Sequence, residues 1–364
     1  MKKVLIPMLA LATLASCSNN GEFTVNGKID PALLGQLQGT VIYMAPAAEK
    51  MVPVDSLTID TVNTFTLKGI AAEPELYNLY MQNGSVIGQF IGESGKLNCD
   101  INMQGVKVSG STLNDSNNEM SDAIAALSQD LNAAFMKAQA EGTEEARAAA
   151  EKLYEEAMVK ANGIATEYYK ANGDNAFGII ALNQVLMTSE NMDLATLDSL
   201  LALGSDKIRN DWRIKETREN YEHKEATKEG KQFVDFEGQT LEGQPAKLSD
   251  FVGKGDFVLV DFWASWCGPC KGEIKYLKEI NEYAEGKNLK VLSVSVWDKI
   301  ENITAAAEAE GMEWNHLFDS NGVATPEYGI NGIPQIMLIS PDGIILKRDL
   351  RGEEMVNYVK EMVK

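Results

Sequence analysis

Histidine and cysteine are scarce in this sequence of 364 residues, which has two histidines and four cysteines. A structural zinc site needs four ligands, commonly two closely spaced pairs of Cys or His. Only Cys267 and Cys270 form such a pair, and neither His223 nor His316 has a second ligand close by in the sequence. A zinc site is therefore disfavoured, no metal is expected, and the pair stands as an isolated dithiol, a pattern that favours thiol-disulfide exchange.

Positive charge is also in short supply. The chain has 33 Lys and Arg against 53 Asp and Glu, which gives a formal net charge of −20. Phosphate binding needs clustered basic residues, so the composition excludes a nucleic-acid partner, and the acidity favours solubility. Four cysteines are few for an exported protein held together by disulfides.

The apolar run at residues 4–15 is too short to span a bilayer, which takes about 20 residues. It follows a basic start, so residues 1–16 read as an export signal. The Leu-Ala-Ser-Cys ending resembles the bacterial lipobox, which implies that Cys17 is lipidated and that residues 17–21 form a polar tether. Such a protein is a membrane-anchored lipoprotein of the bacterial periplasm or cell envelope. An ordinary cleaved signal peptide with a chance cysteine is the alternative.

Two further regions precede the cysteine pair, and a chain of this length suggests two or three domains. Residues 22–112 hold short alternating runs between turn residues, the pattern of a small antiparallel β domain. Cys99 lies in one of these runs, where a small buried hydrophobe is expected rather than a reactive thiol. Residues 113–230 are helical and end in a charged linker. They form either a packing module or a surface for dimerisation or partner binding, and the pattern leaves both open.

The most informative local stretch ends at the cysteine pair. Residues 257–262 are apolar and β-branched, as in a buried strand, and helical spacing begins at residue 271. Cys267 thus falls at a strand-to-helix turn, where unpaired N–H groups and the helix dipole stabilise a thiolate and lower its pKa. Gly268 and Pro269 keep Cys270 one turn further on, since proline is tolerated in a first helical turn.

Beyond this turn the pattern alternates between helices and strands. It predicts an α/β domain over residues 231–364, with a mixed sheet and flanking helices. The expected elements are a helix to about 286, a strand at 291–296, a helix at 300–310, strands at 335–339 and 344–347, and a helix near 353–363.

Residues 260–270 (Val-Asp-Phe-Trp-Ala-Ser-Trp-Cys-Gly-Pro-Cys) resemble the active-site signature of thioredoxins. Residues 328–334 (Tyr-Gly-Ile-Asn-Gly-Ile-Pro) are similar to the thioredoxin segment whose proline is cis and packs against the disulfide. Residues 233–250 resemble the entry into the TlpA-like and ResA-like branch of exported reductases. The resemblance covers residues 231–364 and implies a thioredoxin-like fold there. Residues 22–112 weakly resemble an uncharacterised β domain that precedes TlpA-like domains in exported lipoproteins.

The resemblance implies roles for three residues. Cys267 is the nucleophile that forms a mixed disulfide with a substrate, and Cys270 resolves it. Asp261 lies within an apolar strand, so burial should raise its pKa, and the resemblance makes it the buried acid that exchanges a proton with Cys270. A strand-end aspartate facing solvent is the alternative. The redox-active disulfide Cys267–Cys270 is the only redox group implied, with no separate cofactor.

Pro334 implies a cis Ile333–Pro334 bond that places the Ile333 backbone beside the disulfide, ready to pair with an extended substrate. Trp263 is assigned to the core, with a place in the groove as the alternative. The predicted substrate groove comprises Trp266, Gly268, Pro269, Gly332, Ile333 and Pro334.

Glu273 shares a helical face with apolar residues, and in ResA-like proteins a glutamate at this offset tunes the cysteine pKa. Lys275 departs from the family, where proline is common at that position. An ordinary glutamate on an amphipathic helix is therefore the alternative for Glu273. His316 is expected to be structural.

The favoured function is a thiol-disulfide reductase of protein substrates, acting in cytochrome c maturation or in rescue of misoxidised proteins. An exported reductase needs a membrane electron donor, because its compartment is oxidising. A disulfide isomerase dimerised by the helical region, and a binding lipoprotein with an accessory redox domain, are the alternatives. A peroxidase is disfavoured, since its reactive cysteine would not need Cys270 at this spacing.

Overall fold

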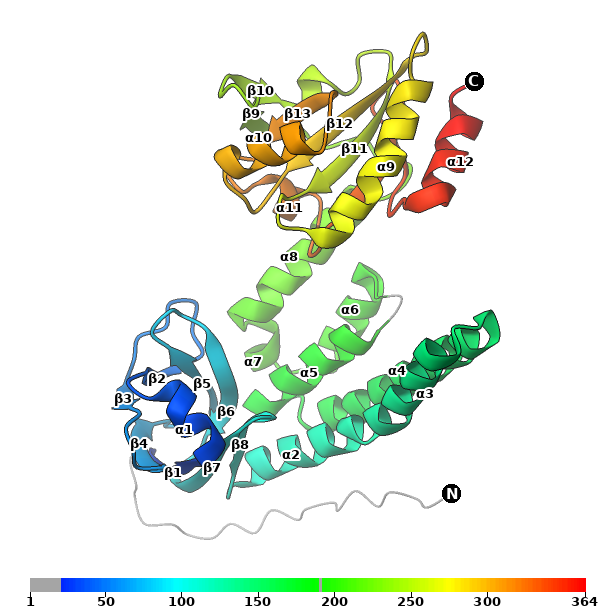
Figure 1. The fold of residues 1–364 in the computed structure, drawn as a ribbon. Helices are drawn as coiled ribbons and strands as arrows, with labels where there is room; N and C mark the ends of the chain where they lie inside the picture. Colours follow the sequence, from blue (N-terminus) through cyan, green and yellow to red (C-terminus); the bar gives the residue numbers. More distant parts are fainter. Residues whose placement is uncertain (1–20, 190–191) are drawn as a thin grey trace. The chain divides into compact units, whose positions relative to one another are not determined.

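The computed structural model describes residues 21–189 and 192–364, which form two units (Figure 1). The first unit runs to residue 192 and includes 198–214, and the second comprises 193–197 and 215–364. The predicted signal peptide and the predicted lipidation site Cys17 lie outside the described residues. No helix in the described part is both long and apolar enough to cross a membrane.

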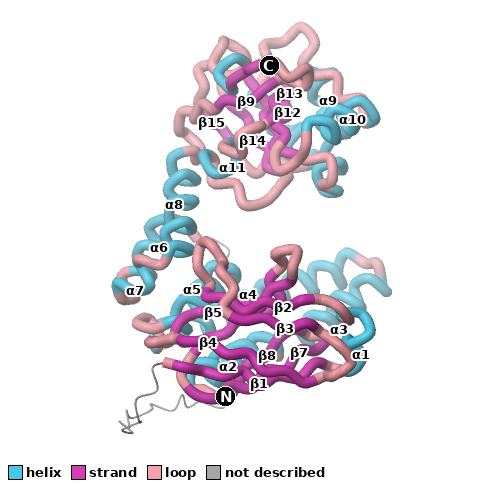
Figure 2. The backbone as a smooth tube through the Cα atoms, turned by 90° about the vertical axis from the view of Figure 1, so that its left-hand side faces the viewer, coloured by secondary structure: helices cyan, strands magenta, loops and turns pink. Residues whose placement is uncertain are grey.

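Two four-stranded sheets form the β part of the first unit, and they share one core that includes Phe23, Leu79 and Phe90 (Figure 2). Buried and exposed residues alternate along several strands, as expected for sheets with one solvated face. The predicted antiparallel β domain is confirmed, with one difference: β1 and β7 run parallel. The sheets are β4-β1-β7-β8, with β1 (Glu22–Ile29), β4 (Thr64–Ile70), β7 (Gly95–Asn102) and β8 (Gly105–Ser109), and β3-β2-β5-β6, with β2 (Val41–Pro46), β3 (Asp55–Thr58), β5 (Glu75–Met81) and β6 (Val86–Gly92). A short helix, α1 (Pro31–Leu37), follows β1.

Helices follow the sheets, as predicted. The long helix α4 buries Ala150, Ala157 and Ala161, whose small side chains let neighbouring helices approach closely. Helix α5 is buried over most of its length. The helices are α2 (Thr112–Ala125), α3 (Leu127–Glu141), α4 (Glu144–Ala171), α5 (Ala176–Thr188), α6 (Leu194–Leu201), α7 (Asp206–Arg209) and α8 (Trp212–Ala226). Most of α8 belongs to the second unit, which therefore starts earlier than the predicted redox domain at residue 231.

The second unit is a seven-stranded mixed sheet with flanking helices, and this confirms the predicted fold class. Strands β11, β12 and β13 run parallel, and β14 pairs antiparallel with β11. The strand order is β10-β9-β13-β12-β11-β14-β15, with β9 (Glu237–Gln239), β10 (Pro245–Lys247), β11 (Phe257–Trp263), β12 (Leu289–Ser295), β13 (Asn315–Phe318), β14 (Gln335–Ile339) and β15 (Ile345–Lys347). The helices are α9 (Gly268–Tyr283), α10 (Ile300–Ala309), α11 (Ala324–Glu327) and α12 (Gly352–Met362), and a 3-10 turn spans Leu248–Asp250.

Strand β11 is central and covered on both faces, which explains its nearly continuous apolar sequence. Val260 and Phe262 point into a core closed by residues such as Tyr328. The side chains of the neighbouring residues in the strand point to the opposite face of the sheet, where Leu259 packs against α9 and α12. Trp263 packs there with both cysteines. Asp261 therefore points to the face that α9 covers.

Candidate active site

Cys267 and Cys270 form a disulfide at the start of α9. Cys267 is the N-cap residue of this helix, and its Sγ accepts a hydrogen bond from the backbone N–H of Cys270 at 3.1 Å. The first N–H groups of a helix have no partner within it, so this contact stabilises negative charge on Cys267 once the disulfide is reduced. Both cysteines are buried, whereas Gly268 and Pro269 between them are exposed. A substrate disulfide therefore has to seat closely on the turn to reach the sulfur.

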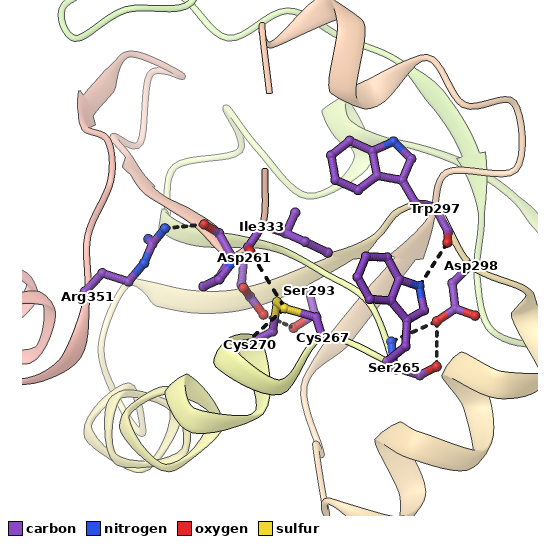
Figure 3. The surroundings of a disulfide bond; sticks show 11 residues. Asp261, Ser265, Cys267, Cys270, Ser293, Trp297, Asp298, Ile333 and Arg351 are labelled. Atoms are coloured by element: carbon purple, nitrogen blue, oxygen red, sulfur yellow. Dashed lines mark hydrogen bonds between the residues drawn. A yellow bond between two sulfur atoms is a disulfide. The ribbon is translucent and has the colours of Figure 1, made fainter. Parts of the chain in front are cut away.

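The Ile333–Pro334 peptide bond is cis and lies beside Cys267. The carbonyl oxygen of Ile333 is 3.8 Å from Cys267 Sγ, and Figure 3 shows this contact. Gly332 is exposed, so an extended segment can reach the main chain next to the sulfur. Arg351, just before α12, donates hydrogen bonds to the carbonyls of Pro334 and Leu350 and thereby fixes the loop.

Asp261 is 2% exposed, which excludes an aspartate facing solvent. Its Oδ2 accepts a hydrogen bond from Ser293 Oγ at 3.2 Å, and Ser293 Oγ in turn accepts one from Trp314 Nε1 at 2.9 Å. Burial raises the pKa of Asp261 to about 7, although the Ser293 hydrogen bond opposes the shift. Figure 3 shows the side chain beside the disulfide. A carboxyl group with this pKa can gain or lose a proton near neutral pH.

Glu273 does not hydrogen-bond to the cysteines. Its Oε2 accepts a hydrogen bond from the backbone N–H of Gly352 at 2.8 Å, at the N-terminus of α12. Burial is the main cause of the raised Asp261 pKa, while the positive charge of Arg351 lowers that pKa and the negative charge of Glu273 raises it. The structure therefore places Glu273 where its charge acts on Asp261, and its effect on cysteine pKa stays a prediction.

A second hydrogen-bonded cluster holds the other side of the cysteine turn. Asp298 Oδ2 accepts from the backbone N–H of Ser265 at 2.8 Å and from its Oγ at 2.6 Å. Trp266 Nε1 donates to the carbonyl of Trp297 at 3.1 Å. The loop after β12 is thereby joined to the loop before α9.

The sequence reasoning missed Ser265, Ser293, Trp297, Asp298 and Arg351. A signal existed for two of them, because Trp297 and Asp298 directly follow a predicted strand, and residues beyond the carboxyl ends of parallel strands often serve binding.

Three further assigned residues, Trp263, His316 and Cys99, are wholly or partly buried. Trp263 is fully buried. His316 stacks on Trp314, its Nε2 lies 3.2 Å from the carbonyl oxygen of Met312, and burial lowers its pKa. Cys99 is buried in β7, and burial raises the pKa of its thiol to about 12. A thiol with this pKa is a poor nucleophile at neutral pH.

Sequence comparison places this chain among redox proteins. Residues 230–348 match the AhpC/TSA family, and residues 23–117 match a domain of unknown function, DUF4369. The chain is 30% identical over 127 residues to the thiol-disulfide oxidoreductase ResA of Geobacillus thermodenitrificans, an alignment that covers 35% of this chain and 72% of that protein. It is 27% identical over 124 residues to ResA of Bacillus subtilis, with 34% and 68% covered. The solved thioredoxin domain of a thiol-disulfide oxidoreductase from Bacteroides vulgatus aligns with 31% identity and a TM-score of 0.36, over 38% of this chain and 99% of that chain.

The chain is thus a thiol-disulfide oxidoreductase of thioredoxin-like fold, and its Cys267–Cys270 pair forms a disulfide. Within that class it belongs to the family of the ResA thiol-disulfide oxidoreductases, and a DUF4369 domain precedes its redox part.

Proposed function

We propose that the enzyme reduces protein disulfides in the bacterial cell envelope. The observation that carries the proposal is the carboxyl of Asp261, buried beside the cysteine pair. A negative charge at this place disfavours thiolate formation on the nearby sulfurs. A couple whose reduced form is not stabilised stays a good reductant, whereas strong oxidants of this fold stabilise their reduced form.

The proposed reaction starts from the reduced enzyme. The Cys267 thiolate attacks one sulfur of a substrate disulfide, forms a mixed disulfide with it, and releases the other substrate sulfur as a thiolate. The leaving thiolate takes a proton from water. The main chain at Gly332 and Ile333 holds the substrate segment during this step.

Cys270 completes the cycle. Asp261 in its ionised form accepts the Cys270 proton, and the Cys270 thiolate attacks Cys267 Sγ. The enzyme disulfide forms, and the second substrate thiolate departs and is protonated. Two electrons have then passed from the enzyme dithiol to the substrate, and a second pair must come from a thiol-disulfide donor in the membrane.

The cellular setting extends this proposal. Lipid on Cys17 would keep the enzyme at a membrane surface, near its electron donor. Cytochrome c maturation and rescue of misoxidised proteins are the two processes that such a reductase would serve, and both present disulfide-bearing proteins as substrates.

The reduction potential of the Cys267–Cys270 couple tests the direction of the reaction. The full chain is equilibrated with defined thiol buffers, and the oxidised fraction is measured after acid quenching. We expect a value near the thioredoxin end, about −270 mV. A value above the glutathione range, toward about −120 mV, contradicts a reductase and favours an oxidase or a dimeric isomerase.

A further inference from the structure

Two exposed tryptophans lie by the reactive turn. Trp266, which precedes Cys267, is 61% exposed, and Trp297, after β12, is 45% exposed. The only other large apolar side chains exposed in residues 215–364 are Val323 and Met362. Figure 3 shows Trp297 and Asp298 on the side of the disulfide opposite Arg351. Trp297 takes no part in the thiol exchange proposed for Cys267 and Cys270.

Neither indole has a free hydrogen-bond donor to offer a ligand. Trp266 Nε1 donates to the Trp297 carbonyl at 3.1 Å, and Trp297 Nε1 donates to Thr325 Oγ1 at 3.1 Å. Thr325 is buried, so this hydrogen bond ties the Trp297 ring to the interior of the domain. An indole N–H is that side chain's only donor, and the exposed ring surfaces therefore present apolar and π contacts alone.

The hydrogen-bond acceptor sites of Asp298, the charged residue next to Trp297, are also occupied. Asp298 Oδ2 accepts two hydrogen bonds from Ser265, and Oδ1 accepts from the Lys299 backbone N–H at 2.7 Å and from Asn302 Nδ2 at 3.1 Å. These four donors fill the acceptor sites that a carboxylate has. Asp298 thus positions the turn, and its carboxylate has few free acceptor sites with which to bind a cation.

The backbone of Trp297 has an unusual conformation. Its φ is +55°, in the left-handed region, where the only other residue besides glycine among those described is Asp349. Aspartate adopts this backbone conformation readily, but for a bulky residue such as tryptophan the conformation is unfavourable. Such strain persists where the surroundings over-determine it, and it gathers at binding sites. Here two hydrogen bonds hold the residue, and the result is an exposed ring.

We infer that Trp297 extends the predicted groove at Trp266 into a substrate-specificity surface, which binds an aromatic or large aliphatic side chain next to the attacked cysteine of the substrate. This inference rests on the proposed function and names its preferred substrates. Neighbours of a cysteine in an extended segment lie about 3.3 Å apart along the chain, so a residue one or two positions away reaches the rings when the cysteine meets Cys267.

The test ranks matched peptides by trapping. A Cys270→Ser variant of the full chain is equilibrated with symmetric peptide disulfides that differ only in the residues flanking the cysteine: Phe, Leu, Ser, Lys or Glu. The Cys267 thiolate displaces one peptide thiolate and keeps the other peptide as a mixed disulfide, which mass spectrometry quantifies. We expect Phe and Leu peptides to be trapped about tenfold more than Ser peptides, the usual scale for one apolar contact.

Two substitutions test whether Trp297 causes the preference for apolar peptides. Trp297→Asn removes the ring, and asparagine tolerates the left-handed backbone, so this substitution should reduce the Phe-over-Ser preference to less than about twofold. Trp212→Asn is the control, because Trp212 is a partly exposed indole in the first unit whose Nε1 is also bonded internally, to the Ala47 carbonyl. It should leave the ranking unchanged.

Three outcomes overturn the inference. They are equal trapping of all peptides by the Cys270→Ser protein, a preference for Lys peptides, which would indicate cation–π recognition, and a Phe preference that survives Trp297→Asn. Trapping needs no turnover, so an inactive or oxidising enzyme contradicts the proposed function without deciding the ranking. If Trp297→Asn does not fold, the peptide ranking of the Cys270→Ser protein still decides whether the preference exists.

Discussion

Asp261 is the residue whose environment departs most clearly from that of an ordinary aspartate. Burial raises its pKa from 3.8 to about 7 in the folded protein. The folded state then holds this proton more tightly than the unfolded chain does. The carboxyl therefore lowers the stability progressively as the pH rises from about 4 to 7, and the full loss persists above pH 7.

Replacing Asp261 with asparagine tests this directly. The variant should gain stability relative to the wild type as the pH rises from 4 to 7, by up to roughly 4 kcal/mol, and the gain should disappear near pH 4. Urea unfolding of both oxidised proteins at several pH values measures the difference. Asp342→Asn removes an exposed carboxylate instead and should show no comparable pH dependence. A pH-independent difference for Asp261→Asn would contradict the buried-acid assignment.

The burial of Asp261 could be predicted from the sequence, but its hydrogen-bond partners could not. The apolar neighbours of Asp261 predicted its burial correctly, because burial of a strand residue follows from local pattern. Ser293 and Trp314 are 32 and 53 positions further along the chain. Their contacts depend on the register of β11 against β12 and on the packing of β13, which no local pattern specifies.

At the scale of elements, α8 packs on the loop that leads to the cis proline. Asn331 Nδ2 donates to Asn220 Oδ1 at 3.0 Å, and His223 Nδ1 lies 2.8 Å from the Pro326 carbonyl oxygen. The close approach needs glycine at position 329, because a Cβ there would lie 2.7 Å from the Asn220 carbonyl oxygen. Gly329 also has φ +58°. Helix α8 thus supports the cis-proline side of the active site.

We expect Gly329→Ala to destabilise the redox unit by roughly 2–4 kcal/mol, through backbone strain and displacement of α8. Gly322→Ala is the matched control, since Gly322 also has a positive φ of +67° but a Cβ added there would have no other atom within 4 Å. It should cost only the strain, roughly 1–2 kcal/mol. Thermal unfolding of both variants measures the difference. Equal losses would show that α8 does not depend on this contact.

In the first unit, Asn114 joins α2 to β6. This buried side chain accepts a hydrogen bond from the Ile91 backbone N–H at 3.0 Å and donates one to the Ile91 carbonyl at 2.7 Å. Asn114→Ala leaves both backbone groups buried without this partner, so we expect a loss of roughly 2–4 kcal/mol in unfolding free energy. Glu119→Ala, at an exposed position of the same helix, should change stability by less than about 0.5 kcal/mol. Denaturant unfolding distinguishes the two, and a small effect of Asn114→Ala would contradict the anchoring role.

At the scale of the whole molecule, the buried side chain of Arg348 links the redox unit to residues before position 231. Arg348 is 8% exposed, and its guanidinium donates to the carbonyls of Thr227 at 2.9 Å and Tyr328 at 2.8 Å. The Gly230 backbone N–H donates to the Ile345 carbonyl at 2.8 Å. Residues before position 231 thus complete the hydrogen bonding of β15 and the residue that follows it.

A fragment of residues 215–364 should therefore be more stable than one of residues 231–364. The shorter fragment lacks Thr227 and therefore two hydrogen bonds of the Arg348 guanidinium, which costs about 3 kcal/mol or more and should lower the melting temperature by roughly 6–12 °C. Calorimetry of both fragments measures the difference. Equal melting temperatures would show that α8 and the segment after it contribute nothing to the redox unit.

By itself, the sequence determined the mixed α/β class, the order of the main elements and the identity of the cysteine pair, because strand and helix periodicity and a motif of four adjacent residues are local properties. The tertiary structure decided which distant residues serve that pair. Asp298 and Trp297 meet the cysteine turn, and α8 joins the redox unit, because strand register and helix packing bring together residues that lie 30 to more than 100 positions apart. The parallel pairing of β1 with β7 has the same cause, since it joins strands separated by six intervening elements.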